Sequence, residues 1–372
     1  MNSVIITGTG RYEPTIIVKN SDFLKSKFFN PKGVPLTKDI KEIIETFQKI
    51  TGINERKYAN PFLLNSDIAT IAAENALESA KISGNKLDKI IVAHNFGDIK
   101  TDSTQNDMVP SLASRVKQKL GIDNPAVIAE DLIFGCPGWL QGVINSYKEI
   151  RSLYGSKVLV IGSETLSRIS DPHDQDSMIY SDGAGAAVLE TINTKEKFGV
   201  LSNLTHSYSL EHANLLRKGS SYNPKINQDH QFIKMDGHEV YLFAIDKVPQ
   251  IIKQNLEATG ISPADIKKVI IHQANEKLDN VIIRNLKSLY RKDKQYTGVE
   301  FNGNLMPMII GNYGNSSVAT IPTLFDLMTK GELPGHDNLK KGDIVLFASV
   351  GAGMNINCMP YKLHQDLKDY RR

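Results

Sequence analysis

The sequence predicts an α/β protein built from two related halves. Short runs rich in Val and Ile, bounded by Gly, Asp, Asn or Pro, alternate with longer stretches that carry the apolar spacing of helices. The chain has 372 residues, 41% of them hydrophobic, which is enough for one large domain or two of ordinary size. A segment of the first half also recurs in the second half, and this repeat favours a duplication.

Six short runs are expected to form buried, mainly parallel strands because they are continuous and rich in Val and Ile. These runs are residues 3–8, 89–94, 125–130, 157–162, 268–273 and 343–349. Residues 66–81 and 237–260 show helical spacing instead.

The repeat relates residues 77–93 to residues 256–272, at an offset of 179 residues. Both segments have the pattern of a helix end, a turn marked by Gly or Pro, and a buried strand. We therefore expect an N-terminal half over 1–195 and a C-terminal half over 196–372. The alternative is chance, since a few identities can arise in any chain of this length.

The same offset groups three scattered residues into a candidate site. It relates Cys136 to Asn315, and each of them follows a glycine and precedes an apolar, helix-compatible stretch. It also places His272 at the end of the second half's strand, where open α/β sheets collect ligand-binding groups. If a pseudo-twofold axis relates the halves, Cys136 and Asn315 begin equivalent helices that face one another.

Cys136 is one of only two cysteines and lies in a Gly-Cys-Pro-Gly corner. A helix N-terminus lowers the pKa of a thiol through its free N–H groups and its dipole, and Pro137 suits the first helical position. The structural alternatives are a packed cysteine, a histidine that ends its strand, and an asparagine in a turn or helix cap. The other cysteine, Cys358, is expected in the core.

Charge and composition argue against several classes of protein. Lys and Arg number 44 against 41 Asp and Glu, so neither a nucleic acid nor a membrane surface is an expected partner. No apolar run is long enough to span a bilayer and no signal-peptide pattern is present, so we expect a cytoplasmic protein. Gly8 and Gly10 lack the rest of a dinucleotide fingerprint, and the acidic loop 171–177 lacks metal-ligand spacing. We expect neither a cofactor nor a metal.

Further motifs extend the pattern over nearly the whole chain. They are TGINER (51–56), GCPG (135–138), VIGSETLSRISDP (160–172), SDGAGAAVL (181–189), IIHQAN (270–275), YGNSSVATIP (313–322) and KKGDIVLFASVGAG (340–353). In this order they resemble the β-ketoacyl-acyl-carrier-protein synthase III family of the thiolase superfamily. The resemblance implies a duplicated five-layer α/β/α/β/α fold, a homodimer, and a decarboxylative Claisen condensation that joins an acyl group to a malonyl-type thioester.

The resemblance also implies roles for the candidate residues. Cys136 resembles the acyl-accepting nucleophile, and His272 and Asn315 resemble the pair that binds the malonyl thioester carbonyl. Two neutral donors at that oxygen stabilise the enolate that remains when CO2 leaves. The backbone N–H groups of Cys136 and Ala352 would form the oxyanion hole, although the family usually has glycine at the second position.

Three departures from the family concern the acyl donor. Relatives that use acyl-coenzyme A usually carry a tryptophan and two arginines that hold the nucleotide, whereas this chain has Thr46, Ile50 and Gln175. Groups that would stack on adenine or meet phosphate are therefore replaced. This favours acyl carrier protein over coenzyme A as the donor, and Lys277 stands where the family has a basic residue used in carrier docking.

Asn275, Gly351 and Val109 are expected to contact substrate. Val109 stands where a phenylalanine closes the acyl tunnel of some relatives, which predicts room for a longer acyl chain. Insertions at 96–108 and 290–305 have no assigned role. Fatty-acid initiation and a specialised lipid or polyketide pathway, such as resorcinol formation, both fit. The alternatives are an acyltransferase of the same fold without condensation and, less favoured, a papain-like thiol hydrolase.

Overall fold

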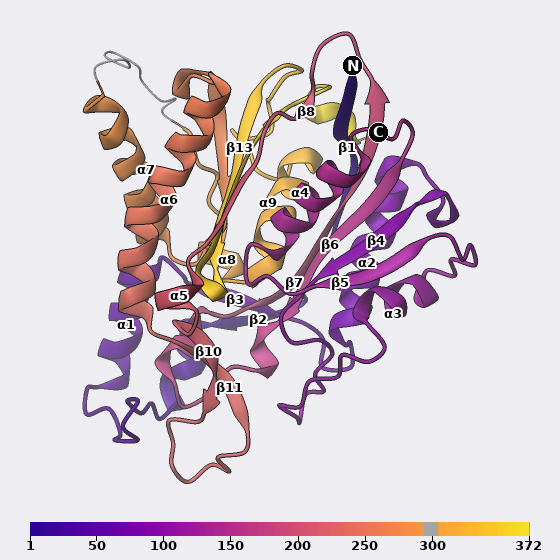
Figure 1. Ribbon diagram of the computed structural model, residues 1–372. Helices are drawn as coiled ribbons and strands as arrows, with labels where there is room; N and C mark the ends of the chain where they lie inside the picture. Colours follow the sequence, from indigo (N-terminus) through magenta and orange to yellow (C-terminus); the bar gives the residue numbers. More distant parts are fainter. Residues whose placement is uncertain (294–303, 372) are drawn as a thin grey trace.

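The computed structural model describes residues 1–293 and 304–371. Two β-sheets stand face to face with a pair of helices between them, and further helices cover both outer faces (Figure 1). This is the five-layer α/β/α/β/α arrangement, so the predicted fold class is confirmed.

The first sheet contains strands from the N-terminal part of the chain. Their order is β1 (Asn2–Tyr12), β7 (Asp182–Asn193), β6 (Lys157–Thr165), β4 (Lys89–Ala93) and β5 (Ile128–Leu132). Strand β4 is parallel to β5 and β6, whereas β7 is antiparallel to β1 and β6.

The second sheet repeats this mixed pattern. It contains β12 (Ile266–Ile271), β13 (Ile344–Gly351), β14 (Asn355–Lys362), β8 (Gly199–Val200) and β9 (Leu204–Ser207). Only β12 and β13 are parallel, and β14 is antiparallel to each of its partners. The expectation of parallel strands holds for the predicted runs that pair with one another, since β4 is parallel to β5 and β6, and β12 is parallel to β13. The sheets as a whole are mixed because β7 and β14 each return directly beside the strand that precedes them, which gives antiparallel pairs.

Helices form the other three layers. The outer layers are α2 (Asn65–Ala80) and α3 (Leu112–Lys119) on the first sheet, and α6 (Gly237–Thr259) and α7 (Glu276–Arg291) on the second. The central pair is α4 (Gly138–Ile150) and α9 (Thr320–Lys330) (Figure 1).

Smaller elements surround one end of the sheets. They are the ribbons β2 (Ile16–Lys19) with β3 (Glu55–Tyr58) and β10 (Leu216–Ser220) with β11 (Gln231–Met235), and the helices α1 (Ile40–Thr51), α5 (Ser209–His212) and α8 (Ile310–Tyr313). Single 3-10 turns are η1 (Asn20–Lys25), η2 (Gly84–Lys86), η3 (Leu166–Arg168), η4 (Gln175–Ile179), η5 (Pro263–Asp265), η7 (Ser317–Ala319), η8 (Ala352–Met354) and η9 (Leu367–Arg371).

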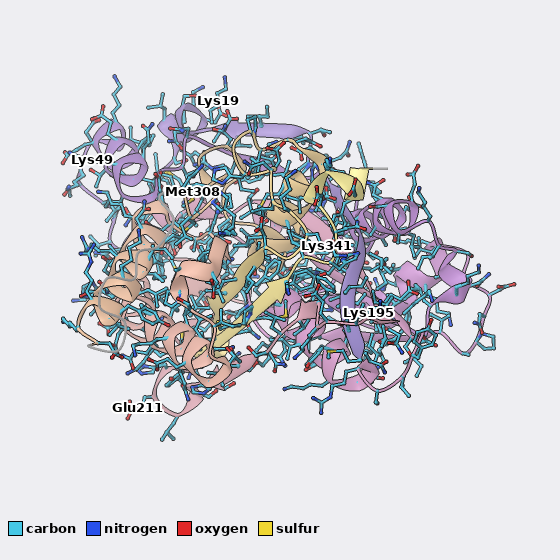
Figure 2. The ribbon with its side chains drawn as sticks, turned by 90° about the horizontal axis from the view of Figure 1, so that it is seen from above. Lys19, Lys49, Lys195, Glu211, Met308 and Lys341 are labelled. Carbon is cyan, nitrogen blue, oxygen red and sulfur yellow. The ribbon has the colours of Figure 1, made fainter. Side chains whose placement is uncertain are left out.

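The central helices share one core with both sheets. Trp139 of α4 is 1% exposed, and its indole N–H donates to the Val160 carbonyl of the first sheet at 3.1 Å. Phe325 of α9 meets Phe347 of the second sheet with ring centroids 5.4 Å apart. Side chains such as Lys19, Lys49 and Glu211 lie at the outline of the molecule (Figure 2). Burial of the large rings thus fixes the central helices against both sheets.

The repeat found in the sequence is visible in the structure as matched elements. Turn η2 and turn η5 are separated by 179 residues, and α2 and α6 end at Ala80 and Thr259, which are separated by the same number. The residue 195 boundary lies between β7 and β8. In the described ranges, no helix is both long enough and apolar enough to cross a membrane.

Candidate active site

Cys136 lies at the corner that leads into α4. Gly135 has φ +66°, a left-handed conformation that suits glycine, and its carbonyl accepts from the N–H of Gly138 at 2.9 Å. Pro137 already has helical torsions, φ −67° and ψ −4°, and the helix proper begins at Gly138. The corner is thus placed as expected, with the helix starting one residue later than the position of Pro137 suggests.

The end of β13 packs directly against this corner. A Cβ at Gly351 would lie 2.6 Å from the backbone nitrogen of Cys136 and 2.8 Å from its Cβ, so glycine is the residue that fits. A Cβ at Gly135 would lie 2.6 Å from the backbone nitrogen of Ala352. The backbone of Gly351 and Ala352, from the second half, therefore lies against the cysteine of the first half.

Asn315 comes before turn η7 and α9. Its side-chain oxygen accepts from the backbone N–H of Ser317 at 2.8 Å, which leaves the amide NH2 free to donate to a ligand. The Ser317 hydroxyl in turn donates to the Cys136 sulfur at 3.4 Å. Asn315 and Cys136 are therefore joined through one intervening residue.

His272 directly follows β12. Its backbone N–H donates to the Ala348 carbonyl of β13 at 3.0 Å, three residues before Gly351. The imidazole is buried, and burial lowers the pKa of His272 to about 4, so the ring is neutral near pH 7. Its Nδ1 has no hydrogen-bond partner within the described chain. His272 can therefore act as a neutral hydrogen-bond donor.

The cysteine itself is not a preformed thiolate. Burial raises the pKa of Cys136 to about 11, and the negative charge of Glu164 acts in the same direction. Hydrogen bonds from the Ser317 hydroxyl and from the backbone N–H groups of Cys136 and Ala352 oppose the rise. The expectation that the helix terminus yields a lowered thiol pKa is wrong, because loss of hydration outweighs the donors.

A cavity of about 160 Å³ opens at Cys136. Its walls include Phe96, Leu166 and Ile233, and its open end reaches Lys218 of β10. Its mainly apolar walls suit a short acyl group attached to the sulfur.

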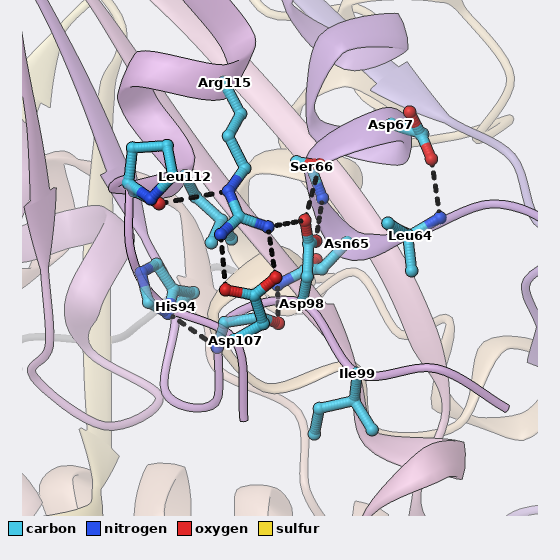
Figure 3. Close-up of polar contacts among 12 residues, drawn as sticks. Leu64, Asn65, Ser66, Asp67, His94, Asp98, Ile99, Asp107, Leu112 and Arg115 are labelled. Atoms are coloured by element: carbon cyan, nitrogen blue, oxygen red, sulfur yellow. Dashed lines mark hydrogen bonds and ion pairs between the residues drawn. The ribbon is translucent and has the colours of Figure 1, made fainter. Parts of the chain in front are cut away.

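The insertion at 96–108 forms a wall of this cavity and is held by ion pairs. Arg115 of α3 contacts Asp98 at 2.7 Å and Asp107 at 2.6 Å, and Asp98 also accepts from the backbone N–H of Ser66 at 2.7 Å (Figure 3). Asp98 and Asp107 pair across the loop by two backbone hydrogen bonds. The loop that carries Phe96 is therefore anchored at its base.

A second pocket, of about 760 Å³, brings together the three residues that depart from the family pattern. Thr46 and Ile50 come from α1, Gln175 comes from η4, and all three line it with Asn275. Ile179 also lines this pocket and accepts the backbone N–H of Asn315 at 3.0 Å. The lining of the pocket therefore includes Asn275, three residues after His272, and Ile179, which contacts Asn315 directly.

The other predicted residues lie apart from these cavities. Val109 is 87% exposed and lies on the surface ahead of α3. Lys277 is exposed on the first turn of α7, and Cys358 is fully buried in the second sheet, as expected. Most of the insertion at 290–305 lies outside the described residues.

Sequence reasoning missed Ser317, Asn95 and Glu164. Glu164 is 1% exposed at the end of β6, and one of its oxygens accepts from the Asn95 side chain at 2.8 Å. A carboxylate that ends an otherwise apolar strand was the available signal, since such a group is rarely buried without a reason. In the part of the chain that the structure describes, no group of His, Cys, Asp and Glu residues could hold a metal ion.

The fold and the site define a duplicated α/β protein with a cysteine at the start of a central helix. Models of the 3-oxoacyl-[acyl-carrier-protein (ACP)] synthase III family match residues 131–209, and models of its C-terminal part match residues 256–363.

Three known proteins illustrate the similarity. The chain is 31% identical over 363 residues to the β-ketoacyl-[acyl-carrier-protein] synthase III of Clostridium botulinum, which covers 95% of this chain and 97% of the relative. The crystal structure of the Aquifex aeolicus 3-oxoacyl-[acyl-carrier-protein] synthase III superposes with a TM-score of 0.75 at 25% identity, over 97% of this chain and 100% of the other. The priming β-ketosynthase of the R1128 polyketide pathway shares the fold, with a TM-score of 0.76 at 21% identity, over 98% of this chain and 97% of the other.

The chain belongs to the 3-oxoacyl-[acyl-carrier-protein] synthase III family. The resemblance seen in the sequence motifs is confirmed.

Proposed function

We propose that the protein is a decarboxylative Claisen-condensing acyltransferase that uses Cys136 as its nucleophile. The thiol loses its proton and attacks an acyl thioester, so that a new thioester forms at the sulfur and the donor thiol leaves. A malonyl-type thioester then loses CO2, and the electron pair of the broken carbon–carbon bond forms an enolate. The enolate carbon attacks the acyl group, and the thiolate of Cys136 leaves to give a 3-oxoacyl thioester.

The observation that carries this proposal is the pair of neutral donors. His272 is kept neutral by burial, and the Asn315 amide is turned so that its NH2 is available. Two neutral donors can stabilise the negative charge on an enolate oxygen by hydrogen bonding, without transferring a proton to it. An acyltransferase without condensation needs only the cysteine and its oxyanion hole, so this pair favours condensation over that alternative. Family membership and the fold give no support to the papain-like alternative.

The backbone N–H groups of Cys136 and Ala352 fit the oxyanion hole, since both donate toward the sulfur. Ala352 differs from the glycine usual in the family only by a side chain, and the backbone donor remains. Gly351 supports this arrangement because its backbone packs on Cys136.

We propose that acyl carrier protein delivers the acyl group. The pocket that contains Thr46, Ile50 and Gln175 has no arginine among its described lining residues, its basic groups are Lys38 and His238, and the rest of its wall is largely apolar, as suits a pantetheine arm. Asn275 lines this pocket, where it can contact the amides of that arm.

The first turn of α7 begins a basic stripe beside this pocket. Lys277, Arg284 and Arg291 are seven residues apart in succession and are all exposed, so they share one face of the helix. An acidic carrier protein is complementary to such a face. Lys277 is the member nearest to Asn275 and to the pocket.

We also propose that the protein is a homodimer joined along β5. In the described chain, this strand ends the first sheet and pairs on one side only, and Ile128 and Ile133 are 55% and 57% exposed. An open strand edge beside exposed apolar side chains is a site for strand pairing. Val109 lies just before α3, and α3 packs on β5. In the proposed dimer, Val109 would therefore contact an acyl chain in the cavity of the partner subunit.

The test is intact-protein mass spectrometry after incubation with acyl donors. The unmodified protein and Cys136→Ser are each offered acyl-carrier-protein and acyl-coenzyme A thioesters of increasing chain length. A mass gain in the unmodified protein alone, with carrier-bound donors, is expected. Efficient loading from acetyl-coenzyme A would overturn the donor proposal while leaving the nucleophile intact. Loading without any 3-oxoacyl product from a malonyl thioester would support the acyltransferase alternative.

A further inference from the structure

A buried carboxylate beside the site has no part in the condensation steps above. Glu164 is the last residue but one of β6, and its Oε2 accepts from both the backbone N–H of Asn95 at 2.9 Å and the side-chain NH2 of Asn95 at 2.8 Å. Its Oε1 has no hydrogen-bond partner within the described chain. A buried carboxylate is costly unless it has a specific role, so the arrangement needs an explanation.

Asn95 connects this carboxylate to the cysteine. Its NH2 also donates to the Ser317 hydroxyl oxygen at 3.2 Å, and the Ser317 hydroxyl lies 3.4 Å from the Cys136 sulfur. Glu164 fixes which end of the Asn95 amide faces Ser317, because an acceptor oxygen attracts the NH2 and repels the carbonyl. Since Ser317 accepts from Asn95, its own proton is directed at the sulfur.

The backbone at Ser317 supports the same geometry. Ser317 has φ 53°, in the left-handed region that residues other than glycine seldom adopt. The conformation is held by the hydrogen bond from its N–H to the Asn315 side chain. Strain of this kind persists where the surrounding structure requires it, and it is concentrated at functional sites.

We infer that Ser317 is a catalytic residue that donates a hydrogen bond to the Cys136 thiolate, and that Asn95 and Glu164 are positioning residues that hold its hydroxyl in that direction. This inference rests on the proposed role of Cys136 as the nucleophile. It adds a donor from the second half of the chain to the activation of a thiol in the first half.

Glu164 contributes by orientation and not by its charge. A negative charge on Glu164 raises the pKa of the Cys136 thiol, which opposes activation. Burial raises the pKa of Glu164 itself to about 7, while His94 and Asn95 oppose the rise and Asp182 adds to it. A proton on the unpartnered Oε1 removes the charge and leaves Oε2 to accept from Asn95. Both states of Glu164 therefore keep the hydroxyl of Ser317 in place.

The test measures the rate at which iodoacetamide alkylates Cys136 between pH 6.5 and 9, by peptide mass spectrometry. This readout needs neither an acyl donor nor condensation, so its outcome is independent of the proposed reaction. Ser317→Ala should slow alkylation about tenfold at each pH, as expected for loss of a hydrogen bond to a charged group. Ser317→Gly removes the same hydroxyl but suits the left-handed backbone, so equal slowing in both variants assigns the effect to the hydroxyl.

Two further variants test the positioning residues. Asn95→Asp replaces the donor by an acceptor of the same shape, so the Ser317 proton turns to the new carboxylate and alkylation should slow as it does in Ser317→Ala. Glu164→Leu should slow alkylation, and Glu164→Gln, which retains an acceptor oxygen, should restore most of the lost rate. Glu164→Gln should also remove the change of slope near pH 7 that ionisation of Glu164 gives to the parent curve.

Ser316→Ala is the matched control, since Ser316 is the neighbouring buried serine and makes no contact with the sulfur in the described structure. It should alkylate like the parent. Parent-like rates in both Ser317→Ala and Ser317→Gly would overturn the inference. Slow alkylation in the Ser317 variants with parent-like rates in Asn95→Asp and Glu164→Leu would overturn the positioning part alone. Thermal unfolding of every variant identifies those whose rates reflect misfolding. If Ser317→Ala is misfolded, the alkylation rate of Ser317→Gly decides whether the Ser317 hydroxyl is needed.

Discussion

At the scale of residues, the site depends on backbone contacts as much as on side chains. Gly351 and Ala352 bring the second half of the chain to within van der Waals contact of Cys136. The positions of Cys136, His272 and Asn315 could be predicted because each of them ends or begins an element whose pattern is readable in the sequence. The raised pKa of the Cys136 thiol could not be predicted, because it depends on which loops surround the corner after folding.

Gly351→Ala tests the backbone contact. The new Cβ would lie 2.6 Å from the Cys136 nitrogen, so the corner must shift and the oxyanion N–H groups move with it. We expect kcat to fall at least about tenfold, because loss of one such donor commonly costs more than that. Steady-state kinetics measures the change. Gly155→Ala controls for a backbone-straining Gly-to-Ala change after the other end of α4, since Gly155 has φ +79° and open space around its Cβ. Parent-like kcat would show that the corner tolerates the displacement.

The pH dependence of acylation follows from the shifted pKa values of Cys136 and His272, and ionisation of Glu164 should change its slope near pH 7. Below its pKa of about 11, the thiolate fraction of Cys136 rises with pH, so single-turnover acylation should rise between pH 6 and 9. His272, with a pKa of about 4, stays neutral between pH 6 and 9, so its ionisation does not change the acylation rate over this range. Rapid-quench mass spectrometry follows the acyl-enzyme. A plateau that begins below pH 8 would contradict the raised thiol pKa.

At the scale of elements, the insertion at 96–108 contributes Phe96 to the cavity at Cys136, and α7 begins directly after Asn275, which lines the second pocket. The amphipathic pattern of the helices and the repeat at 179 residues were readable from sequence because they are periodic. The mixed strand directions were not, since the same Val- and Ile-rich run suits a buried strand of either direction. The anchoring of the insertion by Arg115 likewise depends on a contact made across separate elements.

The basic stripe on α7 gives a prediction about the donor. The double substitution Lys277→Glu with Arg284→Glu should raise KM for an acyl-carrier-protein donor about tenfold or more, because like charges then face the acidic carrier. KM for the corresponding acyl-pantetheine, which lacks the carrier, should change little. Lys86→Glu, an exposed site in turn η2, serves as the control for net charge. An equal rise in KM for both donors would show that the carrier protein docks on another surface.

At the scale of the whole molecule, the five layers bring Cys136, the proposed nucleophile of one half, against a strand end of the other half. The duplicated fold could be predicted from the repeat and from the family motifs together. The offset of 179 residues grouped Cys136, His272 and Asn315, but the contacts that join them, through Ser317 and Ala348, required the structure because they link elements that are distant in the sequence.

The proposed homodimer makes a prediction at this scale. Ile128→Lys combined with Ile133→Lys places two charges on the open edge of the first sheet, where strand pairing would bury them. We expect the dimer to dissociate, with the molar mass from light scattering falling to that of one chain of 41.3 kDa. Leu153→Lys, an exposed apolar site that lies outside this strand, is the control. A monomeric parent protein would contradict the interface.

Trp139 and Phe325 lie on different central helices, yet both rings lie against Phe347 in one shared core. Neither half can therefore complete its own interior, and each supplies hydrophobic surface that the other needs. A chain cut between β7 and β8 would yield two fragments that are inert separately, and condensation would return only when they associate. The rate of condensation would then measure how much of the two fragments has assembled, which makes this enzyme suited to a complementation assay.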